Sequence, residues 1–247
     1  MKILSFINQK QAFPLHYHKE YCISIIKYGV ELLNIGDEQY IGNVNDITIT
    51  HPYELHSNPL FSLNNLLSFH TLYISEETVR SILPFRNTVY FEKRVVKNEQ
   101  LNILFEKLLD CDAKNQKLLL HKFITLLSNF GELSSESKTQ KPLKSWESID
   151  MFIDQNIKEP ITLERMATIA NLNKYSFARK FKQTTGISPV HYTLMKKVFH
   201  CKETMTTKCS ITDKAYEYNF TDISHFSKSF KKFIGIRPKI YQQNFIK

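Results

Sequence analysis

A repeat near the C-terminus constrains the fold of this chain more than any other feature. Residues 166–192 read MATIANLNKYSFARKFKQTTGISPVHY, and residues 214–241 read KAYEYNFTDISHFSKSFKKFIGIRPKIY. The matched pairs are Ala167 and Ala215, Phe177 and Phe226, Phe181 and Phe230, Lys182 and Lys231, Gly186 and Gly235, Pro189 and Pro238, and Tyr192 and Tyr241. A solenoid needs roughly three or more copies to bury its faces. Two copies therefore predict a paired module.

Each copy carries the residues that begin and end two helices joined by a short turn. Side chains of Ser, Thr, Asn and Asp accept hydrogen bonds at helix N-termini, asparagine tolerates left-handed geometry, and glycine ends helices. The expected N-cap residues are Thr162, Asn173, Ser210 and Asp222, the turn residues are Asn171 and Asn219, and the helix-ending residues are Gly186 and Gly235. The offset between the copies grows from 48 residues at Ala167 to 49 at Asn173, which places one extra residue in the second turn. The sequence predicts a helix-turn-helix, twice.

The outer side of the second helix in each copy predicts contact with DNA. At about 100° per residue, Phe177 and Phe181 define the buried side, and Arg179 lies nearly opposite. Arginine and lysine at matched exposed places suit guanine edges and phosphates. The alternative is a merely solvated helix face, but the repetition of the pattern favours DNA. The predicted contacts are Tyr175, Ser176, Arg179 and Lys182 in the first copy, and Ser224, His225, Lys228 and Lys231 in the second.

The repeat resembles the DNA-binding domain of the AraC/XylS family of bacterial transcription regulators. The resemblance extends over about 100 residues, from near Trp146 to the C-terminus, and FSKSFKKFIGIRPKIY is its most diagnostic run. It implies two helix-turn-helix subdomains that read successive major grooves of double-stranded DNA. It also implies RNA polymerase as a partner, a role as an activator, and a location in the bacterial cytoplasm at the nucleoid.

A single long helix is expected to join the two subdomains. From Ser188 to about Thr207 it would be roughly 30 Å long at 1.5 Å per residue, which is close to the ~34 Å between groove segments one turn apart. The family begins this helix with an arginine-rich segment, whereas this chain has YTLMKKVFHCKETM. Lys196 and Lys197 are therefore predicted to contact phosphates without the bidentate geometry of arginine.

Charge is concentrated in the C-terminal part of the chain. Residues 146–247 contain 17 Lys and Arg against 9 Asp and Glu, whereas residues 1–145 contain 16 against 15. The basic half is the one expected to meet a polyanion. Cys22, Cys111, Cys201 and Cys209 lack metal-binding spacing. We find neither a signal peptide nor an apolar run approaching the roughly 18 residues of a membrane span, so no membrane association is expected.

The N-terminal part predicts a small β-barrel or sandwich. Short strand-like segments such as YCISIIKYG, VELLNIG, EQYIG, DITITHP and LLSFHTLYI follow one another between Pro14 and Tyr73, separated by Gly, Asp and Pro. This pattern resembles the cupin-like barrel that many AraC-family members carry as an effector domain. The resemblance implies that a small-molecule effector binds within the barrel.

Three histidines are the candidate effector-binding residues. His16 and His18 alternate along the expected entry strand, so both side chains would point the same way, and His56 follows from a distant strand. Metal-binding cupins bring such histidines and a glutamate onto one ion, which leaves a metal-dependent enzyme tethered to DNA as the alternative function. The places of that glutamate hold Cys22 and Ile23. We therefore expect an effector pocket, no metal, no cofactor and no catalytic residue.

Helical periodicity appears between the barrel and the repeat. Leu101, Phe105 and Leu108 share one helix face, and Phe123 and Leu127 share another. In the family such helices often form a homodimer interface, although they could equally pack onto the barrel. The expected fold class is therefore a two-domain α+β chain, with a cupin-like barrel and dimerisation-type helices followed by an all-α domain. The expected boundaries are 1–131 for the effector and dimerisation domain, 132–145 for a polar linker, and 146–247 for the DNA-binding domain.

Overall fold

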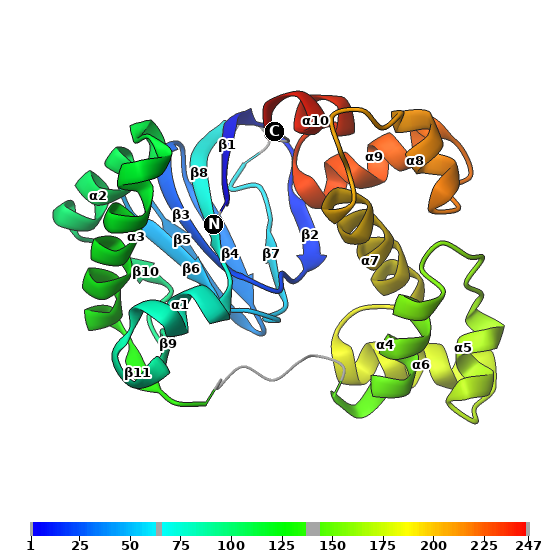
Figure 1. The fold of residues 1–247 in the computed structure, drawn as a ribbon. Coiled ribbons are helices and arrows are strands. Elements are labelled where there is room, and N and C mark those ends of the chain that lie inside the picture. The colour runs from blue at the N-terminus through cyan, green and yellow to red at the C-terminus, as the bar shows by residue number, and fades with distance from the viewer. Residues whose placement is uncertain (1, 63–65, 137–143, 246–247) are drawn as a thin grey trace. The chain divides into compact units, whose positions relative to one another are not determined.

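A computed structural model describes residues 2–62, 66–136 and 144–245 of the chain (Figure 1). Strands fill most of the N-terminal half, and the described residues from 144 onward are helical, so the mixed α+β class is confirmed. The chain divides into two compact units, one of residues 1–12 and 17–141 and the other of residues 13–16 and 142–247.

The larger sheet of the N-terminal half has five strands in the order β1-β8-β3-β6-β10, each antiparallel to its neighbour. Their bounds are Lys2–Gln9 for β1, Leu67–Ile74 for β8, Tyr21–Tyr28 for β3, Ile47–Thr50 for β6 and Val95–Val96 for β10. Ile23 in the central strand pairs with Ile49 on one side and Leu72 on the other. The predicted strands of this sheet are confirmed, but β1 lies before Pro14, where no strand was expected.

A second sheet has the order β2-β7-β4-β5, and a two-stranded sheet pairs β9 with β11. The bounds are Phe13–His16 for β2, His56–Asn58 for β7, Glu31–Ile35 for β4, Glu38–Gly42 for β5, Thr88–Tyr90 for β9 and Glu132–Ser134 for β11. Glu31 on β4 hydrogen-bonds to Thr48 on β6, so the two larger sheets face one another. The turn before β4 needs Gly29, whose φ is +84° and where a Cβ would lie 2.1 Å from the Leu66 carbonyl oxygen.

Three helices accompany the sheets: α1 (Glu76–Ile82), α2 (Glu99–Asp110) and α3 (Ala113–Leu127). Leu101 and Phe105 of α2 and Phe123 of α3 are fully buried in one core with strand residues such as Ile23 and Ile49. The apolar faces read from the sequence therefore pack onto the outer side of the five-stranded sheet, as Figure 1 shows for α2 and α3. This packing was one of the two alternatives left open for these helices.

The C-terminal half contains seven α-helices among its described residues. They are α4 (Glu147–Gln155), α5 (Leu163–Ile169), α6 (Lys174–Thr185), α7 (Pro189–Glu203), α8 (Ile211–Glu217), α9 (Ile223–Ile234) and α10 (Pro238–Phe245). The pairs α5–α6 and α8–α9 are the two predicted helix-turn-helix units. The second turn is one residue longer, as the change of offset required.

Two expectations about connecting segments need correction. The helix between the units, α7, ends at Glu203 instead of near Thr207, because the Thr204 N–H closes the helix on the His200 carbonyl. Its 15 residues give a length of about 22 Å instead of roughly 30 Å. The predicted linker, 132–145, begins with strand β11, which pairs with β9; residues 137–143 of that linker lie outside the described part of the chain.

Candidate nucleic-acid interface and effector site

Helix α6 is held at both ends by the residues that the sequence indicated. The side chain of Asn173 accepts a hydrogen bond from the Ser176 N–H at 2.9 Å, and Gly186 ends the helix with φ +76°. The turn before the helix places Asn171 at φ +52°. These local contacts fix where the helix begins and ends, and hence which side chains its outer face presents.

The inner face of α6 is anchored by aromatic rings. Phe177 and Phe181 are fully buried, and the Trp146 ring lies 5.5 Å from each of theirs, centroid to centroid. On the opposite side Tyr175 is 77% exposed, and Arg179 is exposed as well. The exposed outer side of α6 is therefore the side predicted from the sequence. Of the four predicted contacts in the first copy, Tyr175, Arg179 and Lys182 are exposed and Ser176 is partly buried.

Helix α9 repeats this construction. The carboxylate of Asp222 accepts a hydrogen bond from the His225 N–H at 2.7 Å, and Gly235 ends the helix with φ +87°. Phe226 and Phe230 are fully buried, with ring centroids 5.6 Å apart. Among the predicted contacts, Ser224, His225 and Lys228 are exposed and Lys231 is partly buried.

The structure places Lys196 and Lys197 differently from the other predicted contacts. Lys196 is only 5% exposed and bridges two carboxylates of α4, Asp150 and Asp154, with an Nζ–Oδ1 distance of 2.7 Å to Asp154. Lys197 is buried and donates to the Glu159 carbonyl at 3.1 Å. This burial does not favour the phosphate contacts predicted for them, and both lysines instead tie α7 to the segment of α4 and the loop after it.

The carboxylate of Asp154 confirms the strength of that connection. Burial alone would raise the pKa of Asp154, but hydrogen bonds from His200 and Lys196 outweigh it and lower the pKa to about 2. Tyr192 adds a hydrogen bond from its hydroxyl to Asp150 at 2.7 Å. Lys196, Lys197 and His200 of α7 therefore hold this helix against α4 and the loop after it.

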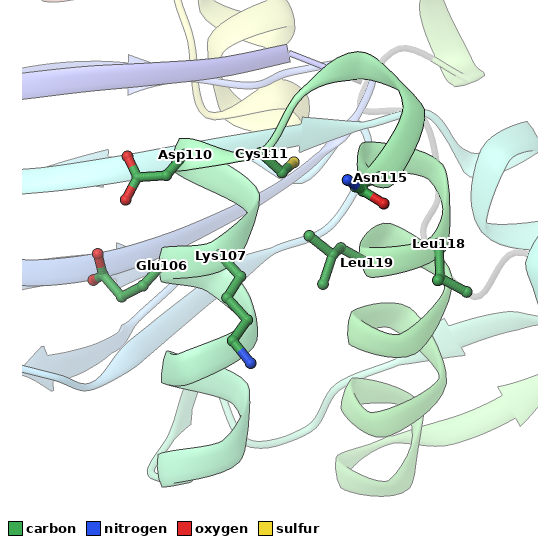
Figure 2. Close-up of a pocket in the computed structure, with 7 residues that line it drawn as sticks. All are labelled: Glu106, Lys107, Asp110, Cys111, Asn115, Leu118 and Leu119. Carbon is green, nitrogen blue, oxygen red and sulfur yellow. The ribbon is translucent and has the colours of Figure 1, made fainter.

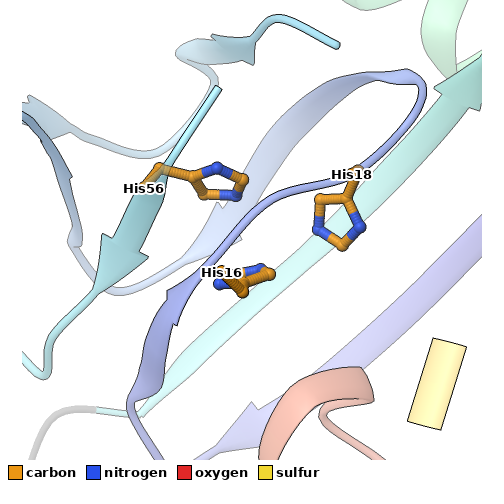
Figure 3. Close-up of side chains that lie close together, drawn as sticks. All are labelled: His16, His18 and His56. Carbon is orange, nitrogen blue, oxygen red and sulfur yellow. The ribbon is translucent and has the colours of Figure 1, made fainter. Parts of the chain in front are cut away.

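The three candidate histidines lie close together (Figure 3). His16 ends strand β2, His18 follows that strand, and His56 begins β7, so the expectation that His16 and His18 share one strand is wrong. All three are buried, and their ring nitrogens include one atom from each residue within 4.8 Å of the others. Nδ1 of His16 lies 2.7 Å from the Pro14 carbonyl oxygen, and Nδ1 of His56 lies 2.8 Å from the Glu54 carbonyl oxygen. Because a carbonyl oxygen only accepts hydrogen bonds, Nδ1 carries a proton in both rings.

That tautomer directs Nε2 of both rings to act as an acceptor or a metal ligand. Burial lowers the pKa of His56, so its ring is neutral near pH 7. Three imidazole nitrogens that lie within 4.8 Å of one another are a donor set that zinc accepts. The same nitrogens can equally hydrogen-bond an organic effector.

A buried acid that was not predicted from the sequence lies between the two sheets. Glu31 is 4% exposed, and it accepts hydrogen bonds from the Thr48 hydroxyl at 2.7 Å and the Asn58 amide at 2.9 Å. Burial raises the pKa of Glu31 to about 7 against the opposing effect of these two bonds. The alternation of Ile and Thr from Ile47 to Thr50 indicates polar side chains on one face of β6, but it does not indicate an acid on the strand opposite.

A groove separates α2 from α3 on their outer side (Figure 2). Glu106, Lys107 and Asp110 border it from α2, and Leu119 borders it from α3. Leu118 at its edge is 57% exposed. The groove thus combines charged and apolar side chains on a surface that the barrel does not cover.

Comparison with known proteins finds relatives for both halves of the chain. A helix-turn-helix domain family matches residues 166–244, and the AraC-like ligand binding domain family matches residues 3–118. The uncharacterized HTH-type transcriptional regulator YbfI of Bacillus subtilis is 26% identical over 225 residues, covering 87% of this chain and 82% of YbfI. The XylDLEGF operon transcriptional activator 2 of Pseudomonas putida is 31% identical over 97 residues, covering 38% of this chain and 62% of the activator.

A crystal structure of ToxT from Vibrio cholerae, bound to an unsaturated fatty acid, has a similar fold. Its TM-score is 0.59 at 16% sequence identity, and the match covers 99% of this chain and 96% of ToxT. This likeness supports the order of a sheet-rich unit followed by a helical one. The relatives named here are regulators, and they give no support to the alternative of a metal-dependent enzyme. Among the described residues, no helix has the length and apolar character needed to cross a membrane.

Proposed function

From the premise that this chain belongs to the AraC-type transcription regulators, we propose that α6 and α9 read two segments of one DNA duplex while the barrel binds a small-molecule effector. The observation that carries the proposal is the matched pair of exposed helix faces. Each is preceded by the same kind of N-cap, backed by two buried phenylalanines and ended by a left-handed glycine.

Direct reading of bases falls to Arg179 in the first copy. Its guanidinium is exposed in the middle of α6, and arginine can bond the O6 and N7 atoms of guanine together. Lys182 lies one helical turn further on and suits a phosphate. In the second copy Lys228 takes the place of Arg179, and a lysine cannot reproduce the two-pronged contact.

The complete set of proposed contacts is limited to residues on the outer faces. It comprises Tyr175, Ser176, Arg179, Lys182, Ser224, His225, Lys228 and Lys231. Lys196 and Lys197 leave this set because their ammonium groups are used inside the domain. The residues retained lie on α6 and α9, the second helices of their units, which enter the major groove in helix-turn-helix proteins.

The test is a comparison of specific and nonspecific DNA. A duplex selected from a random library by the purified protein serves as the specific site. Arg179→Ala should weaken binding to it by about 1–3 kcal/mol and relax the base preference at one position, with little change on random DNA. Lys182→Ala should weaken binding to both duplexes and lower the salt slope by about one. Equal losses on both duplexes for Arg179→Ala would make Arg179 a phosphate contact.

The effector site includes His16, His18 and His56 in this proposal. Two of these rings donate through Nδ1, so Nε2 is the nitrogen that can accept a hydrogen bond in the neutral form of each ring. Replacing His16 and His18 by Gln should change the effector response of a reporter gene without changing DNA affinity in the absence of effector. A fall in melting temperature with an unchanged response would assign the histidines to the stability of the fold instead.

Self-association is proposed through the groove between α2 and α3. The exposed Leu118 and the opposite charges of Glu106 and Lys107 suit a symmetric contact, since each copy can present both signs. Leu118→Glu should lower the dimer fraction measured by analytical ultracentrifugation and leave the melting temperature unchanged. Asn115 also borders the groove, and Asn115→Asp provides a milder variant at the same surface.

Activation through RNA polymerase at the nucleoid completes the proposal. It is supported by the name of the Pseudomonas putida relative, a transcriptional activator, whose similarity extends over 97 residues. The test is transcription in vitro from a promoter that carries the selected site, with and without the protein. An increase in transcript identifies an activator. A decrease in transcript would identify a repressor.

A further inference from the structure

One face of strand β6 carries hydroxyl groups into the space between the two larger sheets. Ile47 and Ile49 belong to the core under α2 and α3, and because strand residues alternate, Thr48 and Thr50 point to the other side. The hydrogen bond from Thr48 to Glu31 of the facing sheet confirms this direction. The inner surface is therefore polar where a simple sandwich would be apolar.

The neighbouring strands extend this polar surface. Across the sheet, Thr48 is in register with Ser24, which is in register with Thr71, and the hydroxyls of Ser24 and Thr71 are 2.7 Å apart. Thr50 is in register with Cys22 in the next row. Polar groups thus line two adjacent rows across β6 and β3, facing Glu31.

Glu31 is a buried acid of this interior, and its hydrogen-bond partners among the described residues are uncharged. Its two oxygens each accept one hydrogen bond from a neutral group, Thr48 and Asn58. The groups that act on the pKa of Glu31 in the described part of the chain include neither a lysine nor an arginine. A buried carboxylate is strongly unfavourable without a positive partner, so the interior lacks the charge that would match an ionised Glu31.

Thr50 adds a second, independent observation. It is 5% exposed, and its hydroxyl has no hydrogen-bond partner among the described residues. Native proteins rarely leave a buried hydroxyl unsatisfied, and a bound water, ion or other ligand supplies the partner in the ordinary case. The hydroxyl lies on the same strand face as Thr48, two residues further along, and therefore points into the same space as Glu31.

We propose that this interior binds a small organic cation, whose ammonium group donates hydrogen bonds to the carboxylate of Glu31 and to the hydroxyl of Thr50. The inference rests on the proposed function in that it names the chemical class of the effector. An anionic ligand is disfavoured, since it would meet a buried acid without any cation. The ring of Tyr73, whose strand position is in register with Cys22 beside Thr50, is compatible with a cation because tyrosine ring faces attract positive charge.

Binding of a cation requires Glu31 to be ionised, so affinity depends on pH. Since the pKa of Glu31 is about 7, its ionised fraction rises from about a tenth at pH 6 to about nine tenths at pH 8, and affinity should rise about tenfold. Two titratable groups near this interior, His56 and Tyr73, do not add a charge near pH 7. Burial holds His56 and Tyr73 in their neutral forms, and Asp46 before β6 is paired with Lys97 at 3.8 Å.

The test uses the purified full chain and a series of primary ammonium chlorides, from methylammonium to butylammonium, with the matching neutral alcohols as controls. Thermal shift and isothermal titration calorimetry at pH 6 and pH 8 measure binding. The variants are Glu31→Gln, which keeps the shape, accepts from Asn58 through its remaining oxygen and can donate its amide to the Thr48 hydroxyl, and the exposed Glu77→Gln as a matched control. Thr50→Val is the third variant, since it removes only the hydroxyl.

At least one ammonium compound should raise the melting temperature of the wild type and of Glu77→Gln, with affinity about tenfold higher at pH 8 than at pH 6. Glu31→Gln should lose this binding and its pH dependence. Thr50→Val should raise the melting temperature of the free protein, because a buried unsatisfied hydroxyl is gone, and yet weaken ammonium binding. A higher melting temperature together with a lower ammonium affinity would distinguish a ligand contact of Thr50 from a purely structural role.

The inference is overturned if no ammonium compound binds, if the alcohols bind as well, or if Glu31→Gln binds as tightly as the wild type. Binding of the selected duplex, measured on the same preparations, tells this failure from a failure of the proposed function. If the protein binds the selected duplex but no ammonium compound, the inference of a cationic effector is rejected and the proposed DNA-binding function stands. If the wild-type protein binds the selected duplex no better than random DNA, the proposed function as a sequence-specific regulator is rejected.

Discussion

A substitution of Lys196 in α7 can decide whether this lysine contacts DNA phosphate or stabilises the domain through its ion pairs with α4. We consider Lys196→Met, which keeps the length and apolar volume of the side chain and removes only the ammonium. The wild-type ammonium is 5% exposed and bridges Asp150 and Asp154, whose side chains are 30% and 43% exposed. The variant leaves these two acids without their shared cation.

The loss in free energy of unfolding expected for Lys196→Met lies between two limits. Removing one partner of a fully buried ion pair costs about 3–5 kcal/mol, whereas an exposed pair contributes about 0.2–1 kcal/mol. Since water reaches both carboxylates, we expect a loss of about 2 kcal/mol in the free energy of unfolding. For a chain of this size, about 2–4 °C per kcal/mol translates this into a fall of roughly 4–8 °C in melting temperature.

Circular dichroism melts at pH 7 measure the stability, and fluorescence anisotropy on a random duplex from low to moderate salt measures the DNA contact. Lys196→Met should lower the melting temperature and leave the slope of log affinity against log salt unchanged. Lys208→Met, at an exposed position of the loop after α7, serves as the control for loss of one positive charge. A wild-type melting temperature with a salt slope lower by about one would refute the reasoning and restore Lys196 as a phosphate contact.

Three further predictions concern the helical half. The stabilisation that Asp154 contributes is present above its ordinary pKa of 3.8 and is lost as pH falls toward about 2, so Asp154→Asn should flatten the dependence of melting temperature on pH between 5 and 2. Asn171 has φ +52°, so Asn171→Val should cost about 1–2 kcal/mol in urea unfolding, whereas Asn171→Gly should be nearly neutral. A fragment starting at Ser145 should fold and bind the selected duplex as a monomer, and binding by the full chain alone would show that the N-terminal half is required.

The features predicted well from the sequence are those determined within a few residues. Asn173 caps a helix by a hydrogen bond to a backbone N–H three residues away, and Asn171 and Asn219 adopt left-handed geometry in turns of four and five residues. Such contacts depend on the local chain alone. The two helix-turn-helix units were therefore predictable in type and nearly in their bounds.

The features that the sequence did not disclose depend on residues far apart in the chain. Lys196 looked like a surface cation because nothing near it in the sequence accounts for its charge, and its partner Asp150 lies 46 residues away. Strand β1 pairs with β8 at the other end of the barrel segment, between residues such as Ser5 and His70. The buried position of Glu31 in the barrel could not be predicted from the sequence because a glutamate at the start of a strand is ordinarily exposed.

The two copies agree in what shapes the backbone and differ in what faces outward. Alanine, phenylalanine, glycine, proline and tyrosine recur at matched buried or turn positions, whereas Tyr175 corresponds to Ser224 and Arg179 to Lys228. The copies therefore present equivalent helices with different chemistry. One chain should then read two unlike half-sites, so the selected duplex should lack the dyad symmetry expected of two identical readers. Substituting Lys228 by Arg makes the second face more like the first, and selection with that variant should enrich guanine at a position where the wild type is tolerant. An unchanged preference would mean that α9 contributes phosphate contacts alone.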